Sequence, residues 1–198
     1  MPRKYELKRR AERMQETRQR IVEAAVELHQ TVGPAQASLS AIAERAGVER
    51  QTLYRHFPDE RSLHMACSGH YMERNPLPGA DALRRIADPR ERLRQGLGEL
   101  YRYYAANEAM FSNVVRDAEL HPVVREVFQQ RATGLAELHA TLAEGLASGG
   151  KRRRRRLDAA LWLALGFHTW RALVREAGLS TGEAADVMCA SVLCAAQP

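Results

Sequence analysis

Apolar residues recur along most of this chain at intervals of three and four positions, the spacing of one face of an α-helix. In the first such stretch Ile21, Ala25, Leu28 and Val32 share one stripe, which ends before Gly33-Pro34. Strand-like alternation is absent, and Gly and Pro are sparse inside the periodic stretches. The pattern predicts an all-α protein of about nine helices.

Breaks in this periodicity divide the chain into helices and domains. We expect a first helix over residues 17–31, two short helices within residues 38–57 and a fourth helix over about residues 59–74. Later stretches predict helices over residues 88–106, 108–118, 121–147, 155–177 and 180–196. The segment Asn75-Pro76-Leu77-Pro78-Gly79 interrupts the pattern. It predicts a boundary between an N-terminal domain, residues 17–75, and a C-terminal domain, residues 76–198, with residues 1–16 as a basic arm.

Residues 38–57, SLSAIAERAGVERQTLYRHF, predict two short helices joined by a tight turn. Ser38 can cap the first helix, and Gly47 can take the positive φ that the turn requires. Leu53 and Phe57 give the second helix a buried edge. Its outward side chains are donors, cations and one flat ring, which suit base edges and phosphate oxygens: Arg50, Gln51, Thr52, Tyr54, Arg55 and His56. An ordinary helical corner with a polar outer face is the alternative, but this concentration of side chains favours DNA binding.

This segment resembles the TetR family of bacterial transcriptional regulators through the motif Gly47-Val48-x-x-x-Thr52-Leu53-Tyr54-x-His56-Phe57, with Ile42-Ala43 before it and Leu63 after it. The resemblance covers roughly residues 17–66. It implies an all-helical homodimer with an N-terminal three-helix DNA-binding domain. It also implies a larger C-terminal domain that dimerises and usually binds a small molecule. By the same resemblance, bases would face Arg50 and Gln51, and phosphates would contact Ser38, Thr52, Tyr54 and His56.

Two positions depart from the family pattern. Glu60 stands where the family commonly has a lysine that meets a backbone phosphate. Arg61 is a candidate replacement, although it lies about 100° away around a helix. Ser40 stands where arginine is frequent. Ser40 and Arg61 therefore remain candidate DNA contacts, and both departures weaken particular contacts rather than the resemblance.

The formal net charge of +6 is unevenly distributed. Residues 1–57 hold eleven Lys and Arg against seven Asp and Glu, which concentrates attraction for nucleic acid at the N-terminus. The basic arm could follow phosphates or enter a minor groove, or it could be a solubilising tail. Its cations are Arg3, Lys4, Lys8, Arg9, Arg10 and Arg13.

A second basic segment, KRRRRR, occupies residues 151–156 after Ser148-Gly149-Gly150. Cations at a helix N-terminus oppose the helix dipole. We therefore expect a solvated loop and first helical turn rather than a second DNA contact.

Eight apolar or aromatic residues of the C-terminal helices are candidates for an effector pocket, by resemblance to related proteins: Tyr101, Tyr104, Met110, Phe111, Phe128, Trp162, Phe167 and Trp170. A pocket of this kind suits a flat or lipophilic ligand, whereas the alternative is that they simply fill the core. Two stripes on the last helices, Leu161/Leu165/His168 and Val187/Ser191/Cys194, predict pairing with a second copy of the chain.

These features predict a ligand-responsive repressor that binds a palindromic operator in double-stranded DNA as a homodimer. A small hydrophobic or aromatic effector, not identifiable from the sequence, would release it. A constitutive DNA-binding protein without an effector is the alternative.

Other functions are less well supported by the sequence. No nucleophile elbow, phosphate loop or zinc-protease motif is present, so an enzyme is not expected. Histidines at positions 64, 70, 121 and 168 are too widely separated to form a ligand motif, so neither a metal nor a cofactor is expected. Three cysteines without CxxC spacing indicate reduced thiols in a cytoplasmic protein. The most apolar run, residues 159–167, is too short to span a bilayer, so no membrane association is expected.

Overall fold

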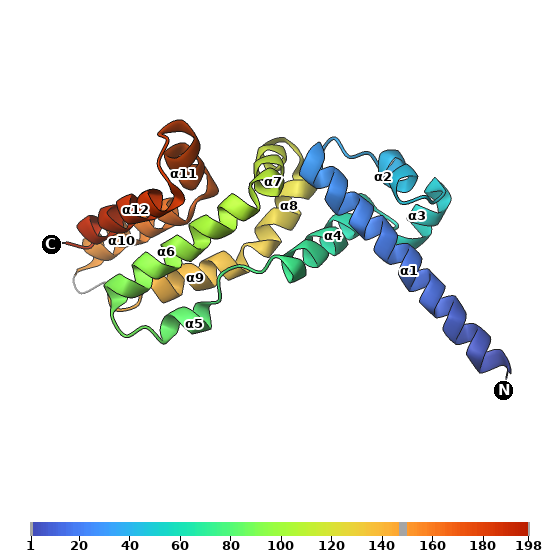
Figure 1. The fold of residues 1–198 in the computed structure, drawn as a ribbon, viewed down its shortest axis with the longest axis horizontal. Helices are drawn as coiled ribbons and strands as arrows, with labels where there is room; N and C mark the ends of the chain where they lie inside the picture. The colour runs from blue at the N-terminus through green and yellow to red at the C-terminus, as the bar shows by residue number, and fades with distance from the viewer. Residues whose placement is uncertain (1, 147–149, 198) are drawn as a thin grey trace. The chain divides into compact units, whose positions relative to one another are not determined.

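The structure is a computed structural model that describes residues 2–146 and 150–197 (Figure 1). Within those ranges the regular secondary structure is helical, with twelve α-helices, one π-helical turn and no strand. This confirms the predicted all-α class, although the helices are more numerous than expected. None of the helices described is long and apolar enough to cross a membrane. The chain forms two compact units.

The first unit comprises Met1–Asn75 together with Ala109–Gln130. Its helices are α1 (Pro2–Thr31), α2 (Leu39–Arg45), α3 (Arg50–His56), α4 (Glu60–Arg74), α7 (Glu108–Leu120) and α8 (Pro122–Arg131). In this unit α1 packs against α2, α3 and α4. The core between them contains Ile21, Ala25, Ile42, Leu53, Phe57, Leu63 and Cys67, among other residues.

Helix α1 begins well before the start expected at residue 17. Residues 6–16 are exposed, and their Glu, Lys, Arg, Ala and Gln side chains have high helix propensity. A Lys8–Glu12 ion pair at i,i+4 spacing, 3.9 Å long, supports the exposed turns. The expectation that this helix starts at Thr17 is therefore wrong, because strong local propensity extends it without a buried face.

The C-terminus of α1 is completed by side chains from α7. Asn113 donates to the carbonyls of His29 (3.0 Å) and Gln30 (2.9 Å), while Arg116 donates to the carbonyl of Val32 (3.0 Å). These bonds satisfy carbonyls that a helix end leaves without intrahelical partners. Gly33 follows with φ +100°, and a Cβ there would collide with the side chains of Arg116 and Asp117. The positive φ favours glycine at this position, and the missing side chain leaves room for Arg116 and Asp117 of α7.

The second unit comprises Pro76–Glu108 and Arg131–Pro198. Its helices are α5 (Ala80–Arg84), α6 (Pro89–Ala106), α9 (Thr133–Ala143), α10 (Lys151–Leu165), α11 (Phe167–Arg171) and α12 (Thr181–Ala195), with a π-helical turn, η1, over Ala172–Glu176. Helix α6 packs against α12 and α9, and α10 lies beside α12 (Figure 1). The buried Arg92 guanidinium ties α6 to other segments by donating to the carbonyls of Ile86, Thr141 and Glu144.

Several predicted helix ends are confirmed by their caps. Asp59 accepts from the Ser62 amide (2.6 Å) and Asp88 from the Arg90 amide (3.0 Å). Ser180 and Glu183 form a reciprocal capping box at the start of α12. These ends were predictable because each cap involves residues adjacent in the sequence.

Two long predicted helices are interrupted. The stretch 121–147 divides into α8 and α9 around Ala132, and Gly134 at the start of α9 approaches the Leu77 side chain. The stretch 155–177 divides at Gly166, whose extended ψ of 133° ends α10 before α11 begins. Helix α5, with Leu83 buried, was not predicted because five residues are too few to show a period.

The basic segment of residues 151–156 forms the first turns of α10. The expected helical turn is therefore confirmed, whereas the expectation that part of the segment is a loop is wrong. Five of its six side chains are exposed and Arg153 is partly buried, which keeps the charges in solvent while the backbone is helical. The preceding residues 147–149, part of the expected loop, lie outside the described residues.

The expected outward stripe of α10 is also corrected. Leu161 and Leu165 are fully buried inside the second unit. The exposed apolar side chains of α10 are Trp162 and Leu163 instead. Helical period alone could not choose between these neighbouring faces, because α10 is apolar on both.

Candidate nucleic-acid interface

The α2–turn–α3 segment has the local geometry that the sequence predicts. Ser38 Oγ accepts from the Ala41 amide at 3.2 Å and caps α2. Gly47 adopts φ +63°, and the Val48 amide returns to the Ala43 carbonyl at 3.0 Å. The turn therefore depends on a glycine that can enter the left-handed region.

Helix α3 is anchored by one buried edge. Leu53 is 0 % exposed and Phe57 is 2 % exposed, and both belong to the core that also contains Ile21 and Ile42. The Arg18 guanidinium lies 4.8 Å from the centroid of the Phe57 ring and covers it from α1. These contacts hold a two-turn helix with its other side facing solvent.

Most candidate DNA contacts lie on the side of α3 that faces solvent, and the rest lie in neighbouring segments of the sequence. Thr52 and His56 are partly buried, and the others are exposed: Ser38, Ser40, Arg50, Gln51, Tyr54, Arg55 and Arg61. The first turn of α3 contains no acidic residue, and its last turn contains Arg55 and His56. Partial burial, followed by the charges of Arg18 and Arg55, lowers the pKa of His56, which favours a neutral imidazole.

Arg50 and Tyr54 are organised together on α3. Arg50 Nη2 donates to the Tyr54 hydroxyl at 3.1 Å, and the guanidinium carbon lies 5.5 Å from the ring centroid. An arginine held against a ring loses less side-chain freedom when it binds. The structure thus places a preoriented guanidinium at the start of α3.

Arg61 and Glu60 have partners within the first unit. Arg61 Nε donates to Glu126 Oε1 of α8 at 2.8 Å, so contact with a phosphate would require exchange of this ion pair. The Glu60 carboxylate lies 3.2 Å from His64 Nε2 and 3.4 Å from His121 Nε2. Glu60, which stands where the family commonly has lysine, therefore lies next to two histidines. The motif did not predict this contact.

The eight effector-pocket candidates do not form one group. Tyr101, Tyr104, Phe167 and Trp170 pack together in the second unit, with the Tyr104–Phe167 and Phe167–Trp170 ring centroids each 5.4 Å apart. Trp162 is 45 % exposed and stacks on His139 at 4.5 Å. The other three candidates, Met110, Phe111 and Phe128, belong to the first unit.

Hydrogen bonds fix two of the clustered aromatics at the end of α10. Tyr101 donates to the Ala164 carbonyl (2.9 Å) and Tyr104 to the Leu165 carbonyl (2.7 Å). Burial raises the pKa of both hydroxyls, so both stay protonated donors. Trp170 is fully buried, yet its indole Nε1 has no hydrogen-bond partner among the described residues. In this cluster the two tyrosine hydroxyls are therefore hydrogen-bonded, whereas the Trp170 indole N–H has no acceptor among the described residues.

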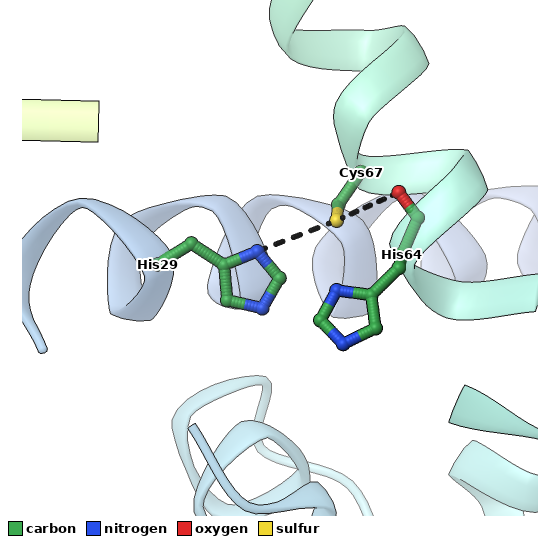
Figure 2. A group of neighbouring side chains, drawn as sticks. All are labelled: His29, His64 and Cys67. Atoms are coloured by element: carbon green, nitrogen blue, oxygen red, sulfur yellow. Dashed lines mark hydrogen bonds between the residues drawn. The ribbon is translucent and has the colours of Figure 1, made fainter. Parts of the chain in front are cut away.

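A second group of polar side chains lies in the core of the first unit and was missed by the sequence analysis. His29 on α1 meets His64 and Cys67 on α4 (Figure 2). Burial, with smaller effects from His64 and Asp117, lowers the pKa of His29 to about 3. The only sequence signal was the helical spacing His64-x-x-Cys67, because His29 is distant along the chain.

Comparison with known proteins identifies the family of the segment that contains α2 and α3. Residues 21–66 match the family model of bacterial regulatory proteins, tetR family. The HTH-type transcriptional activator FasR of Mycolicibacterium smegmatis is 31 % identical over 111 residues, which cover 56 % of this chain and 46 % of FasR. The match thus spans about half the length of that relative.

Solved structures show that the fold extends beyond the matched segment. NalD of Pseudomonas aeruginosa, the secondary repressor of the MexAB-OprM multidrug efflux pump, superimposes with a TM-score of 0.64. Its identity is 21 %, over 93 % of this chain and 97 % of NalD. PfmR from Thermus thermophilus gives a TM-score of 0.57 at 20 % identity, over 88 % of this chain and 97 % of PfmR.

The α2–turn–α3 geometry is that of a helix-turn-helix segment. Residues 21–66 match the tetR family model, which confirms for this segment the resemblance inferred from its motif. The individual DNA contacts and effector contacts stay predictions.

Leu53→Ala should destabilise the first unit by about 2–5 kcal/mol, because it removes a fully buried side chain and leaves a cavity beneath α3. Urea unfolding followed by circular dichroism would measure the loss. The matched control is Gln51→Ala on the exposed side of α3, which should change stability by less than about 0.5 kcal/mol. Equal stability of the two variants would contradict the anchoring role of Leu53.

Proposed function

We propose that this chain is a homodimeric repressor that binds a palindromic operator and is released by a small hydrophobic or aromatic effector. Residues 1–16 and 17–75 would then serve as basic arm and DNA-binding domain, and residues 76–198 as effector-binding and dimerisation domain. The observation that carries the proposal is the anchored helix α3, whose buried edge leaves Arg50, Gln51 and Tyr54 directed to solvent.

The side chains of α3 divide by chemistry into two roles. Arginine can donate two parallel hydrogen bonds to guanine in the major groove, and glutamine can pair with adenine. Arg50 and Gln51, in the first turn of α3, are therefore assigned to base discrimination. Hydroxyl and imidazole groups suit phosphate oxygens, which position the helix without specifying sequence. Ser38, Thr52, Tyr54 and His56 are assigned to this second role.

Dimerisation is supported by the exposed apolar side chains of α10 and α12. Leu163 is 61 % exposed on α10, and Val187 is 44 % exposed on α12. Ser191 and Cys194 continue the exposed stripe of α12 at helical spacing. Twofold pairing of two such helices would bury this surface in a four-helix bundle. Two copies of α3 would then be spaced about 34–36 Å apart, or a small multiple of that distance, as successive major grooves require.

The effector proposal rests on the cluster of Tyr101, Tyr104, Phe167 and Trp170. A flat apolar ligand with one hydrogen-bond acceptor could take the place of contacts between these aromatic rings. Its acceptor could receive the hydrogen bond that Trp170 Nε1 does not make within the described residues. The π-helical turn η1 begins two residues after Trp170. Within it, the Arg175 guanidinium carbon lies 5.8 Å from the centroid of the Trp170 ring, and Arg175 pairs with Glu108. Single π-turns occur often at functional sites.

An effector can release the operator only if it binds the DNA-incompetent state more tightly. Known relatives include proteins named as an activator, FasR, and as a repressor, NalD. A reporter gene under the chain's own operator would assign the direction of control. Constitutive DNA binding without an effector is the competing account, and the third experiment below separates the two.

The first expected outcome concerns DNA recognition. After operator selection from a random duplex library, Arg50→Ala should lose about 1–3 kcal/mol at the matched site and relax preference at one base pair. Tyr54→Phe keeps the ring but removes the hydroxyl, so it should weaken binding to all sequences and change base preference less than Arg50→Ala does. Arg102→Ala, an exposed arginine of the second unit, is the control and should bind like the parent. Unchanged specificity and affinity in Arg50→Ala would refute the assigned role.

The second expected outcome concerns assembly. Leu163→Glu should be monomeric at micromolar concentration in sedimentation velocity, because pairing would bury an unpaired carboxylate. Leu120→Glu alters a leucine that is 86 % exposed on α7, and it should remain a dimer like the parent. A monomeric parent chain, or a dimeric Leu163→Glu variant, would rule out this interface.

The third expected outcome concerns the effector. Trp162→Phe leaves Trp170 as the one tryptophan of the chain, so fluorescence then reports the aromatic cluster alone. A true effector from a panel of aromatic and lipophilic compounds should change this fluorescence, raise the unfolding temperature and weaken operator binding. Trp170→Phe keeps an aromatic ring without the donor and should bind that compound more weakly. If no compound alters operator affinity, constitutive binding becomes the better account.

A further inference from the structure

Two histidines and a cysteine converge in the core of the first unit, outside the proposed DNA and effector sites. His29, His64 and Cys67 are 4 %, 7 % and 2 % exposed, and one potential ligand atom of each lies within 4.8 Å of the others. In Figure 2 a ring nitrogen of each histidine is turned toward the Cys67 sulfur. Imidazole and thiolate together are the donor set of Zn²⁺ sites.

We propose that His29, His64 and Cys67 bind one Zn²⁺ ion between α1 and α4. Zn–S and Zn–N bonds of about 2.3 and 2.0–2.1 Å at a tetrahedral angle separate the sulfur and nitrogen by about 3.6 Å. Cys67 Sγ and His29 Nδ1 are 3.5 Å apart. Two of the three ligand atoms therefore already have the separation that the ion requires.

The third ligand has the supporting contact typical of metal-bound histidine. His64 Nε2 lies 3.2 Å from the Glu60 carboxylate, which leaves Nδ1 as the coordinating atom. A histidine ligand usually donates its second N–H to a carboxylate or carbonyl, which fixes its tautomer and orientation. Glu60 lies at the position where the family motif commonly has lysine, and a lysine could not accept this proton.

The charges near the cluster also suit a divalent cation. Zn²⁺ displaces the Cys67 proton, which leaves to solvent, and the resulting thiolate supplies one negative charge. The Glu60 carboxylate supplies the second, and the Asp117 carboxylate acts electrostatically on the His29 ring. The buried ion would thus be compensated by nearby opposite charge.

A purely structural role leaves part of the cluster unsatisfied. The Cys67 thiol donates to the His64 carbonyl at 3.3 Å, so the His29–Cys67 contact is completed by the proton on His29 Nδ1. The Nε2 lone pair of His29 then lies buried with no partner among the described residues. An aliphatic side chain would fill the same space without that cost. Metal binding gives the polar side chains a reason to be there.

The test uses the full chain, reduced and stripped with a chelator, and titrated with Co²⁺ and then Zn²⁺. One Co²⁺ per chain should give visible d–d bands and a near-ultraviolet thiolate charge-transfer band, and Zn²⁺ should displace both. Cys67→Ser should abolish the charge-transfer band, and His29→Gln and His64→Gln should weaken binding strongly. Cys189→Ser, which alters the other buried thiol, and Cys194→Ser, which alters an exposed one, should match the parent.

Thermal unfolding provides a second readout that separates binding from folding. Zn²⁺ should raise the unfolding temperature of the parent and of Cys189→Ser but not of Cys67→Ser. If Cys67→Ser does not fold, His29→Gln and His64→Gln take its place, and Zn²⁺ should not raise their unfolding temperature as it raises that of the parent. A charge-transfer band that survives in Cys67→Ser, or that disappears in Cys194→Ser, overturns the site, as does the absence of any band in the parent. None of these outcomes depends on DNA binding, so the proposed function can fail independently.

Discussion

The proposed DNA-binding surface depends on the burial of Leu53 and Phe57. Helix α3 has only seven residues, and an isolated helix of that length is not stable in water. Its backbone becomes helical because these two side chains complete a core built by α1, α2 and α4. Every outward side chain of α3 is positioned by that contact. The orientation of Arg50 thus derives from apolar packing beneath it, and the Tyr54 contact refines it.

The same unit shows how a helix end can be completed by a distant segment. The last carbonyls of α1 are satisfied by Asn113 and Arg116 of α7, and Gly33 permits their approach. Asp117 adds a bond from the Ala35 amide at 2.9 Å. Residues 109–130 therefore belong with the N-terminal unit, although residues 76–108 of the second unit precede them in the sequence. Each compact unit of this chain is therefore assembled from two segments that are separated in the sequence.

Aromatic residues of the second unit combine packing with local hydrogen bonding. Gly166 ends α10 and leaves carbonyls of its last turn without intrahelical partners. The Tyr101 and Tyr104 hydroxyls satisfy two of them, so the cluster that includes Trp170 is held by directional bonds as well as by ring contacts. Such a cluster is a rigid core with one unused indole donor. The unpaired indole N–H of Trp170 gives the cluster a polar group that a purely apolar core would lack.

The sequence by itself determined the helical class, the α2–turn–α3 motif and the caps at Ser38, Asp59 and Ser180. Each depends on residues within a few positions of one another, so local spacing is enough to predict it. Only the tertiary structure brought His29 to Cys67, paired Arg61 with Glu126 and separated the aromatic candidates between two units. It also decided that Leu161 is buried while Trp162 faces solvent. Helical periodicity identifies which residues share a face, but the neighbours of that face are set by how helices from distant parts of the chain cross.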